Sequence, residues 1–294
     1  MIRAFGTLHP LTAFFYFCAV LSVAMFSTHP ILLAQALLGG LCFCASLERP
    51  REFLRSLGFA LPLFLLTSVT NPLFAHNGVT PLFFMNGNPV TREALLCGAA
   101  LATMLLAVLQ WSRAYGYIMT TDKFLYLFGR AVPRLALTLS MAMRFVPLFR
   151  AQTFRVHRAQ KAMGLYTGKS LSDRFRAASR VFLAMISWSL ENAADTGDVM
   201  HARGCGLKGR SHFSLFRWSV RDAVLLAFSA ALLGIVLLGQ ALGGATFYFY
   251  PRISALSGSP LSMAVYIAFG ALTLLPCIME MKENMKWIYS VSKI

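Results

Sequence analysis

Six long apolar runs, separated by short polar links, make up most of the chain. The runs cover residues 11–26, 30–47, 57–75, 92–112, 223–242 and 261–279. A helix needs about 20 predominantly apolar residues to cross the hydrocarbon core of a bilayer. We therefore expect an all-α fold, a polytopic membrane protein with about six transmembrane helices.

The polar links predict where these helices begin and end. Residues 48–55 hold five charged side chains and are expected to lie outside the helices. Asn71 and Pro72 are expected to break the third helix, because proline lacks an N–H donor and asparagine favours turns. Residues 76–91 are rich in glycine, proline and asparagine and predict an irregular loop, after which Thr91 caps the fourth helix.

Aromatic and histidine side chains near the ends of the runs predict contact with the membrane interface. Trp111, Trp218 and Trp287 each lie close to the end of an apolar run, as interfacial anchors do. His9 and His29 each precede a proline at such an end. We expect these two imidazole side chains to be hydrated.

Residues 113–221 have a different pattern, with 18 Lys/Arg and 5 Asp/Glu. Two long helices are predicted there, from about Pro133 to Met163 and from about Ser170 to Arg203. Basic side chains follow one face of the first helix while phenylalanine and leucine fill the other, which indicates an amphipathic helix. The sequence therefore divides into residues 1–112 (four spans), 113–221 (a basic helical region) and 222–294 (two spans and a tail).

Both long helices end in a small residue, a variable residue and a glycine. The two triplets are Ala162-Met163-Gly164 and Ala202-Arg203-Gly204. Gly204 stands where a left-handed helix stop is expected, and Ser170 with Asp173 predicts a capping box. The planar fork of Arg203 suits a carboxylate on a partner. It could equally offset the negative end of its own helix dipole.

Composition supports a membrane protein and gives its orientation. The 294 residues are 57% hydrophobic and 13% charged, with a net charge of +16. Such a charge can indicate nucleic-acid binding, but basic residues also collect on the cytoplasmic side of membrane proteins. With the N-terminus inside, 25 of the 27 basic residues fall inside. We expect both termini and residues 113–221 to be cytoplasmic, and no nucleic-acid partner.

The sequence predicts no catalytic residue, metal site or bound cofactor. Residues 164–170 are similar to a phosphate-binding loop, but only three residues separate the glycines where that motif needs four. The histidines and cysteines do not follow metal-site spacings. Ionisable residues are almost absent from the spans, which disfavours an ion-coupled carrier. An independent membrane carrier or membrane enzyme with a dispersed intramembrane site remains the alternative.

Four motifs together resemble the transmembrane T component of energy-coupling-factor (ECF) transporters, the EcfT/CbiQ-like family that includes the cobalt-type permease subunit. They are residues 71–78 (Asn-Pro-Leu-Phe followed by His76 and Gly78), 144–148, 159–164 and 202–204. The resemblance implies a coupling subunit of the cell inner (plasma) membrane that is not an enzyme. It implies two ABC-type ATPases at the helix ends and a separate S component that binds the vitamin or metal ion.

The resemblance assigns ATPase coupling to the six residues of the two triplets, Ala162, Met163, Gly164, Ala202, Arg203 and Gly204. In this family both helices end in Ala-Arg-Gly, and Arg203 carries that role over directly. Met163 departs from the pattern, since a thioether cannot pair with a carboxylate. Lys161 or Arg158 could supply charge there as an auxiliary contact. We therefore expect the two helix ends to bind the ATPases unequally, with Arg203 contributing more than Met163.

Overall fold

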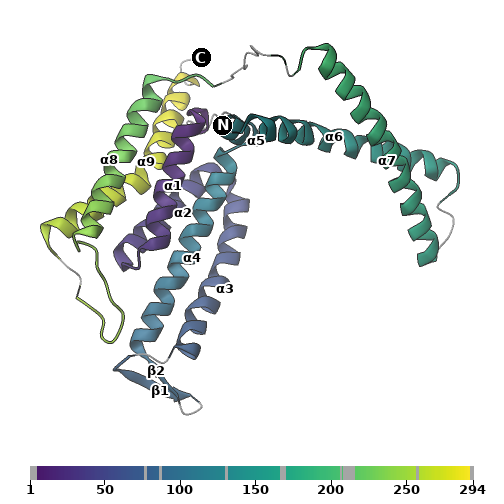
Figure 1. The fold of residues 1–294 in the computed structure, drawn as a ribbon. Helices are drawn as coiled ribbons and strands as arrows, with labels where there is room; N and C mark the ends of the chain where they lie inside the picture. The colour runs from purple at the N-terminus through teal and green to yellow at the C-terminus, as the bar shows by residue number, and fades with distance from the viewer. Residues whose placement is uncertain are drawn as a thin grey trace. The chain divides into compact units, whose positions relative to one another are not determined.

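The computed structural model describes residues 5–75, 78–85, 88–129, 132–165, 170–205, 207, 216–255 and 258–291 (Figure 1). Most of these residues are helical, which confirms the predicted all-α class. The chain forms two compact units. The first combines Met1–Phe124 with Phe216–Ile294, and the second is Leu125–Leu215. Each unit is described by itself.

The first unit is a bundle of six helices, preceded by a short 3-10 turn over Phe5–Thr7. The helices are α1 (Pro10–Phe26), α2 (Pro30–Leu47), α3 (Pro50–Phe74), α4 (Arg92–Ile118), α8 (Val220–Ala241) and α9 (Pro260–Val291). Helix α2 contacts both α4 and α9, α3 contacts α4, and α8 contacts α9. Helix α1 contacts α4 and α8. Segments from the two ends of the chain therefore build one core.

Five helices in the described part of the chain are long and apolar enough to cross a membrane: α2, α3, α4, α8 and α9. Helix α1 is also apolar but has only 17 residues, at the lower limit for a span. Large apolar side chains such as Leu65 and Leu66 of α3 are exposed on the outside of the bundle. In a bilayer, lipid tails cover such side chains, so the protein is membrane-embedded.

An aromatic cluster forms the centre of the bundle, and Trp111 is part of it. The Trp111 indole is fully buried and donates a hydrogen bond to the Ala36 carbonyl at 2.8 Å. The Tyr16 hydroxyl donates to the Leu272 carbonyl at 2.7 Å. The predicted interfacial role of Trp111 is therefore wrong. Helix α4 continues to Ile118, six residues past the predicted end, and this places the indole inside the helix packing.

His9 and His29 are buried caps, which corrects the expectation that they are hydrated. Their side chains are 6% and 1% exposed. Each imidazole Nδ1 accepts a hydrogen bond at 3.3 Å from the backbone N–H two residues later, at the start of α1 and α2. The other nitrogen of His29 lies 2.9 Å from the Tyr266 hydroxyl. A His-Pro pair thus starts each of these helices, with proline at the first helical position.

Helix α3 begins earlier than the sequence predicts, and the expected break at Asn71 and Pro72 does not end it. It begins at Pro50, inside the charged link, and continues through Pro72 to Phe74. Without an N–H at Pro72, the Ser68 carbonyl loses its helical donor. Helix α4 packs closely at this point: the Asn71 amide donates to the Ala94 carbonyl at 2.9 Å, and Gly98 lies directly against Ser68.

An antiparallel β-hairpin replaces the irregular loop expected between α3 and α4. Strand β1 (Pro81–Met85) pairs with β2 (Asn88–Thr91). The predicted cap is confirmed, since the Thr91 hydroxyl accepts a hydrogen bond from the Ala94 N–H at 3.3 Å. Residues 76–77 and 86–87 of the expected loop lie outside the described residues.

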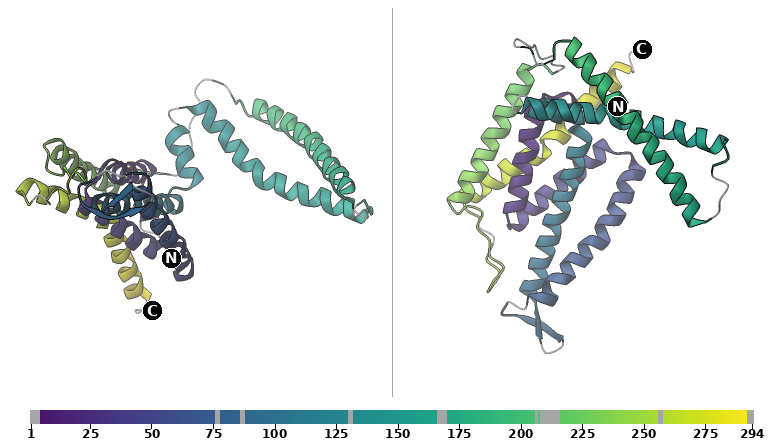
Figure 2. Two further views of the ribbon diagram at one scale, coloured as in Figure 1. Left: turned by 90° about the horizontal axis from the view of Figure 1, so that it is seen from below. Right: turned by 45° about the vertical axis from the view of Figure 1, so that its right-hand side comes forward.

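The second unit contains the two long helices that the sequence predicts. Helix α6 covers Pro133–Ala162 and α7 covers Leu171–Ala202. They pack against each other in an antiparallel arrangement, crossing in Figure 1 and running side by side in the left view of Figure 2. A short helix that was not predicted, α5 (Thr121–Gly129), precedes them.

We predict that the close contact between α3 and α4 makes Gly98 sensitive to substitution. A Cβ at Gly98 would lie 2.5 Å from the Ser68 carbonyl oxygen, whereas a Cβ at Gly116 of the same helix meets no atom within 4 Å. Gly98→Ala should lower the free energy of unfolding by about 1–3 kcal/mol. Gly116→Ala should leave it unchanged or raise it. Thermal unfolding in detergent measures both, and equal midpoints would contradict the prediction.

Candidate functional site at two helix ends

Helix α6 ends in a glycine stop at Gly164. Gly164 has φ +75°, in the left-handed region that favours glycine. Its N–H donates to the Lys161 carbonyl at 3.1 Å, and the next N–H, of Leu165, donates to the Gln160 carbonyl at 3.2 Å. These two bonds are the Schellman arrangement, which satisfies the free carbonyls of a helix end.

Helix α7 ends in the same way, as predicted for Gly204. This glycine has φ +72°, its N–H donates to the His201 carbonyl at 2.9 Å, and the Cys205 N–H donates to the Met200 carbonyl at 2.9 Å. The preceding residues also match in backbone geometry, with φ/ψ of −82°/9° at Arg203 and −76°/1° at Met163. Met163 and Arg203 therefore occupy equivalent positions. We call residues 162–164 and 202–204 the tips of α6 and α7.

The glycine stop is a structural device and does not by itself mark a functional site. Helix α8 in the first unit ends at Gly243 with φ +81° and the same two backbone bonds. The tips of α6 and α7 differ from the end of α8 because they terminate two basic, amphipathic helices that pack against each other. The residue that each tip presents, Met163 or Arg203, is exposed.

The two tips lie at opposite ends of the helix pair. The ring centroids of Phe149 and Trp188, near the middle of α6 and α7, are 5.4 Å apart. Because the helices are antiparallel, the tip of α7 lies beside the first half of α6 (Figure 2). A 30-residue helix is about 45 Å long. The tips are thus too far apart to form one small-molecule site.

Arg203 borders a polar groove between the two helices. The groove has a volume of about 260 Å³ and is lined by Met141, Arg144, Phe145 and Leu148 of α6 and by Asn192, Asp195, Thr196, Val199 and Arg203 of α7. None of the ion pairs within the described residues includes Arg203. Arg203 is exposed at the end of the helix.

The tip of α6 presents an apolar residue among basic neighbours. Met163 is 66% exposed, and the predicted auxiliary residues Arg158 and Lys161 are exposed on the last two turns of α6. Arg180 of α7 reaches the same tip and donates a hydrogen bond to the Leu165 carbonyl at 3.2 Å. Sequence reasoning missed Arg180, because only the antiparallel packing brings it to a residue 15 positions earlier.

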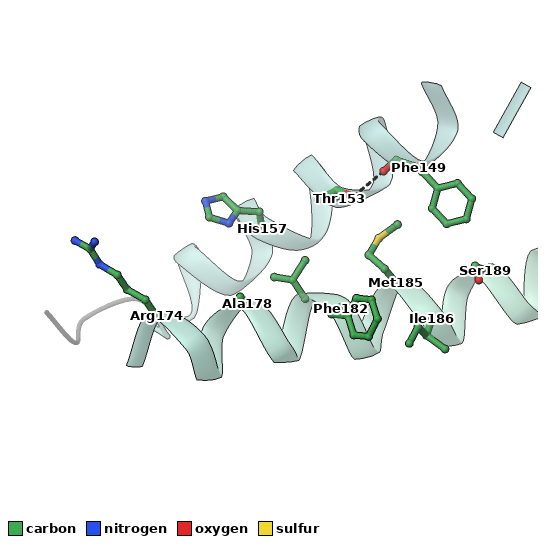
Figure 3. Close-up of a pocket in the computed structure, with 10 residues that line it drawn as sticks. Phe149, Thr153, His157, Arg174, Ala178, Phe182, Met185, Ile186 and Ser189 are labelled. Atoms are coloured by element: carbon green, nitrogen blue, oxygen red, sulfur yellow. Dashed lines mark hydrogen bonds between the residues drawn. The ribbon is translucent and has the colours of Figure 1, made fainter. Parts of the chain in front are cut away.

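A second groove between the helices is apolar. It has a volume of about 610 Å³, with Phe149 and His157 from α6 facing Phe182, Met185 and Ile186 from α7 (Figure 3). Phe182 is 65% exposed. Apolar side chains of α6 and α7 thus leave an apolar surface exposed between the two helices.

The predicted capping box at the start of α7 is not formed. Ser170 is the N-cap residue, but its hydroxyl makes no cap hydrogen bond and lies 3.2 Å from the Ser172 hydroxyl. A capping box is found instead on α8, between Ser219 and Asp222. Residues 166–169, within the sequence that is similar to a phosphate-binding loop, lie outside the described residues.

Similarity to known proteins points to one class of transporter component. The chain is 37% identical over 107 residues to the energy-coupling factor transporter transmembrane protein EcfT of Listeria innocua, covering 36% of this chain and 40% of that protein. It is 32% identical over 118 residues to the protein of the same name from Lactobacillus helveticus, covering 40% and 43%. The chain thus spans about two fifths of the length of these two relatives.

A longer but weaker similarity covers more of both chains. The chain is 26% identical over 186 residues to EcfT 1 of Listeria monocytogenes, covering 59% of this chain and 70% of that protein. No family model matches the chain.

We predict that the left-handed glycine at the tip of α7 is required for its geometry. Gly204→Ala should destabilise the tip by about 1–2 kcal/mol, because an L-residue with a Cβ resists positive φ. Gly197→Ala, inside the same helix with no atom near its Cβ, is the matched control. Hydrogen–deuterium exchange of residues 199–205 should accelerate in the first variant alone. Equal exchange in both variants would show that the stop does not constrain the tip.

Proposed function

Because the chain is a homologue of the energy-coupling factor transporter transmembrane proteins, we propose that it is the membrane coupling subunit of an ECF-type ABC importer. Two cytoplasmic ABC-type ATPases bind the tips of α6 and α7. A separate S component in the membrane binds the substrate, a vitamin or a metal ion such as cobalt. The chain passes the ATP-driven closure of the ATPases to the S component and has no catalytic residue of its own.

The observation that carries this proposal is the pair of equivalent tips at opposite ends of α6 and α7. Both tips have the same backbone stop, and they lie at opposite ends of the helix pair. An ATPase dimer offers two similar surfaces of this kind, one on each subunit. A solute site would instead need side chains that converge on one cavity.

The side chains at the tips support an unequal grip. The Arg203 guanidinium can form a bidentate pair with a carboxylate, and such charge-assisted bonds are about twice as strong as neutral ones. Met163 can only fill an apolar groove. Arg158, Lys161 and Arg180 bring positive charge close to Met163 and would partly compensate for it.

The apolar groove of Figure 3 fits the other half of the proposal. Helix α7 carries large apolar side chains at Phe182 and Leu183 that are more than 60% exposed. An S component is itself a membrane protein and would cover this surface with apolar side chains of its own. In the proposed orientation, both termini and the α6–α7 pair lie on the cytoplasmic side of the cell inner membrane, as the distribution of basic residues favours.

Co-purification tests the proposal as a whole. The tagged chain is extracted from its native membrane in a mild detergent, and the proteins that accompany it are identified by mass. Two nucleotide-binding subunits and one small membrane protein are expected. A chain that purifies alone and moves a solute across liposome membranes unaided would contradict the proposal and support an independent carrier.

We predict that Arg203→Ala weakens association with the ATPases more than Met163→Ala does. Loss of a hydrogen bond to a charged group costs about 1.5–3 kcal/mol, so the yield of bound ATPase should fall by roughly tenfold or more. Met163→Ala should have a smaller effect, and Met163→Arg should strengthen binding. The measurement is the ATPase recovered per mole of chain in a pull-down.

Arg176→Ala, an exposed arginine elsewhere on α7, is the control for a simple loss of charge. It should leave the ATPase yield unchanged. Equal losses for the alanine variants at 163 and 203, or a larger loss at 163, would refute the unequal grip.

A further inference from the structure

The N-terminal segment Phe5–His9 lies outside the membrane-spanning helices, and Phe5, Leu8 and His9 in it are buried. Phe5 is 1% exposed, and its ring lies 5.1 Å from the Tyr16 ring and 5.7 Å from the Phe43 ring, measured between centroids. Its backbone N–H donates to the Glu280 carboxylate at 3.0 Å. Residues 275 positions apart are therefore joined by a buried hydrogen bond.

This segment binds the chain near residue 124, where the chain leaves the bundle. Lys123 of α5 is 5% exposed, and its ammonium group donates to the Gly6 carbonyl at 2.5 Å. Burial lowers the pKa of Lys123, and the negative charge of Asp222 opposes that shift. The first of the two stretches that make up the first unit ends one residue later, at Phe124. Lys123 is therefore an anchor at the exit from the bundle.

The same segment also binds the chain near residue 216, where the chain returns to the bundle. The first unit resumes at Phe216. Trp218 stacks on the His9 imidazole with ring centroids 4.4 Å apart and planes inclined by 10°. The His9 backbone N–H donates to the Asp222 carboxylate at 2.9 Å. The other oxygen of Asp222 accepts hydrogen bonds from the backbone N–H and the hydroxyl of Ser219, at 3.0 and 2.7 Å.

We propose that the segment Phe5–His9 is a clamp that fixes both junctions of the second unit to the bundle, with Lys123 and Trp218 as its positioning residues. Residues 124 and 216 are separated by more than ninety positions along the chain, yet their neighbours bind one five-residue segment. The clamp as a structure stands independently of the proposed function. Its role in coupling rests on that function: with both junctions held, movement of α6 and α7 reaches the bundle instead of being lost in the connections.

Cross-junction hydrogen–deuterium exchange on the full chain in nanodiscs tests the clamp. Lys123→Met should accelerate exchange by about tenfold or more at residues 121–124 and also at 216–219, because it removes a buried hydrogen bond of a charged group. Trp218→Ala, a change at a half-exposed residue, should loosen residues 121–124 as well as 216–219. Lys123→Arg, which can still donate to the Gly6 carbonyl, should retain the protection of both junctions.

Two exposed residues of α9 provide matched controls. Lys282→Met and Trp287→Ala remove the same chemical groups from the surface of the same unit, and neither should alter exchange at the junctions. If Lys123→Met and Trp218→Ala each loosen only their own junction, the segment does not join the two and the clamp is overturned. A uniform rise in exchange along the whole chain would also overturn it, since that indicates general unfolding.

A second measurement separates the clamp from the proposed function. In the complex co-purified with its ATPases, Lys123→Met should retain the wild-type ATPase yield because both tips are intact. Addition of ATP should alter exchange in α1–α4 of the wild type and of Lys123→Arg, and not of Lys123→Met. Retention of that response in Lys123→Met would overturn the role of the clamp in coupling. Absence of any ATPase from the wild-type preparation would overturn the proposed function, while the exchange in nanodiscs still decides the clamp.

Discussion

Buried ionisable side chains join the N-terminal segment to the rest of the first unit. An ionised group removed from water is strongly destabilising unless hydrogen bonds or an opposite charge compensate it. Asp222 and Glu280 are each 4% exposed and accept backbone N–H groups of the N-terminal segment, and Lys123 donates to its Gly6 carbonyl. Each of these three side chains therefore has a hydrogen-bond partner in that segment. Glu48 and Arg113 form a further pair at 2.8 Å between the end of α2 and α4.

A second constraint acts on the tips of α6 and α7. Glycine determines where each helix ends, and the length of the helices determines how far apart the two tips lie. The left-handed glycines stop both helices with the same hydrogen bonds, so Met163 and Arg203 are presented in equivalent ways. The antiparallel packing then places these residues at opposite ends. Two equivalent helix ends that lie far apart do not converge on one cavity, as the side chains of a solute site would.

The sequence predicts the features that depend on local chemistry. The apolar runs located the membrane helices, and the glycines of the two triplets marked the ends of α6 and α7, because a bilayer imposes length and a left-handed turn favours glycine. The start of α3 was misplaced because Pro50 can begin a helix within charged sequence. The hairpin over residues 81–91 was missed because its short strands contain prolines.

Features that depend on distant segments could not be predicted in this way. Nothing near Lys123 in the sequence indicates that its ammonium group binds Gly6, 117 residues away. The burial of Trp111 and the contact of Arg180 with Leu165 likewise result from packing between helices. Only the packing of distant segments brings these side chains to their partners.

Site-specific photo-crosslinking in native cells tests most directly the central claim that each tip contacts its own nucleotide-binding subunit. A photoreactive amino acid is placed at position 163 or at position 203, and the captured proteins are identified by mass. The account predicts that each position captures an ABC-type ATPase subunit. Capture of no ATPase at either position, or of ATPase at one position only, would contradict it.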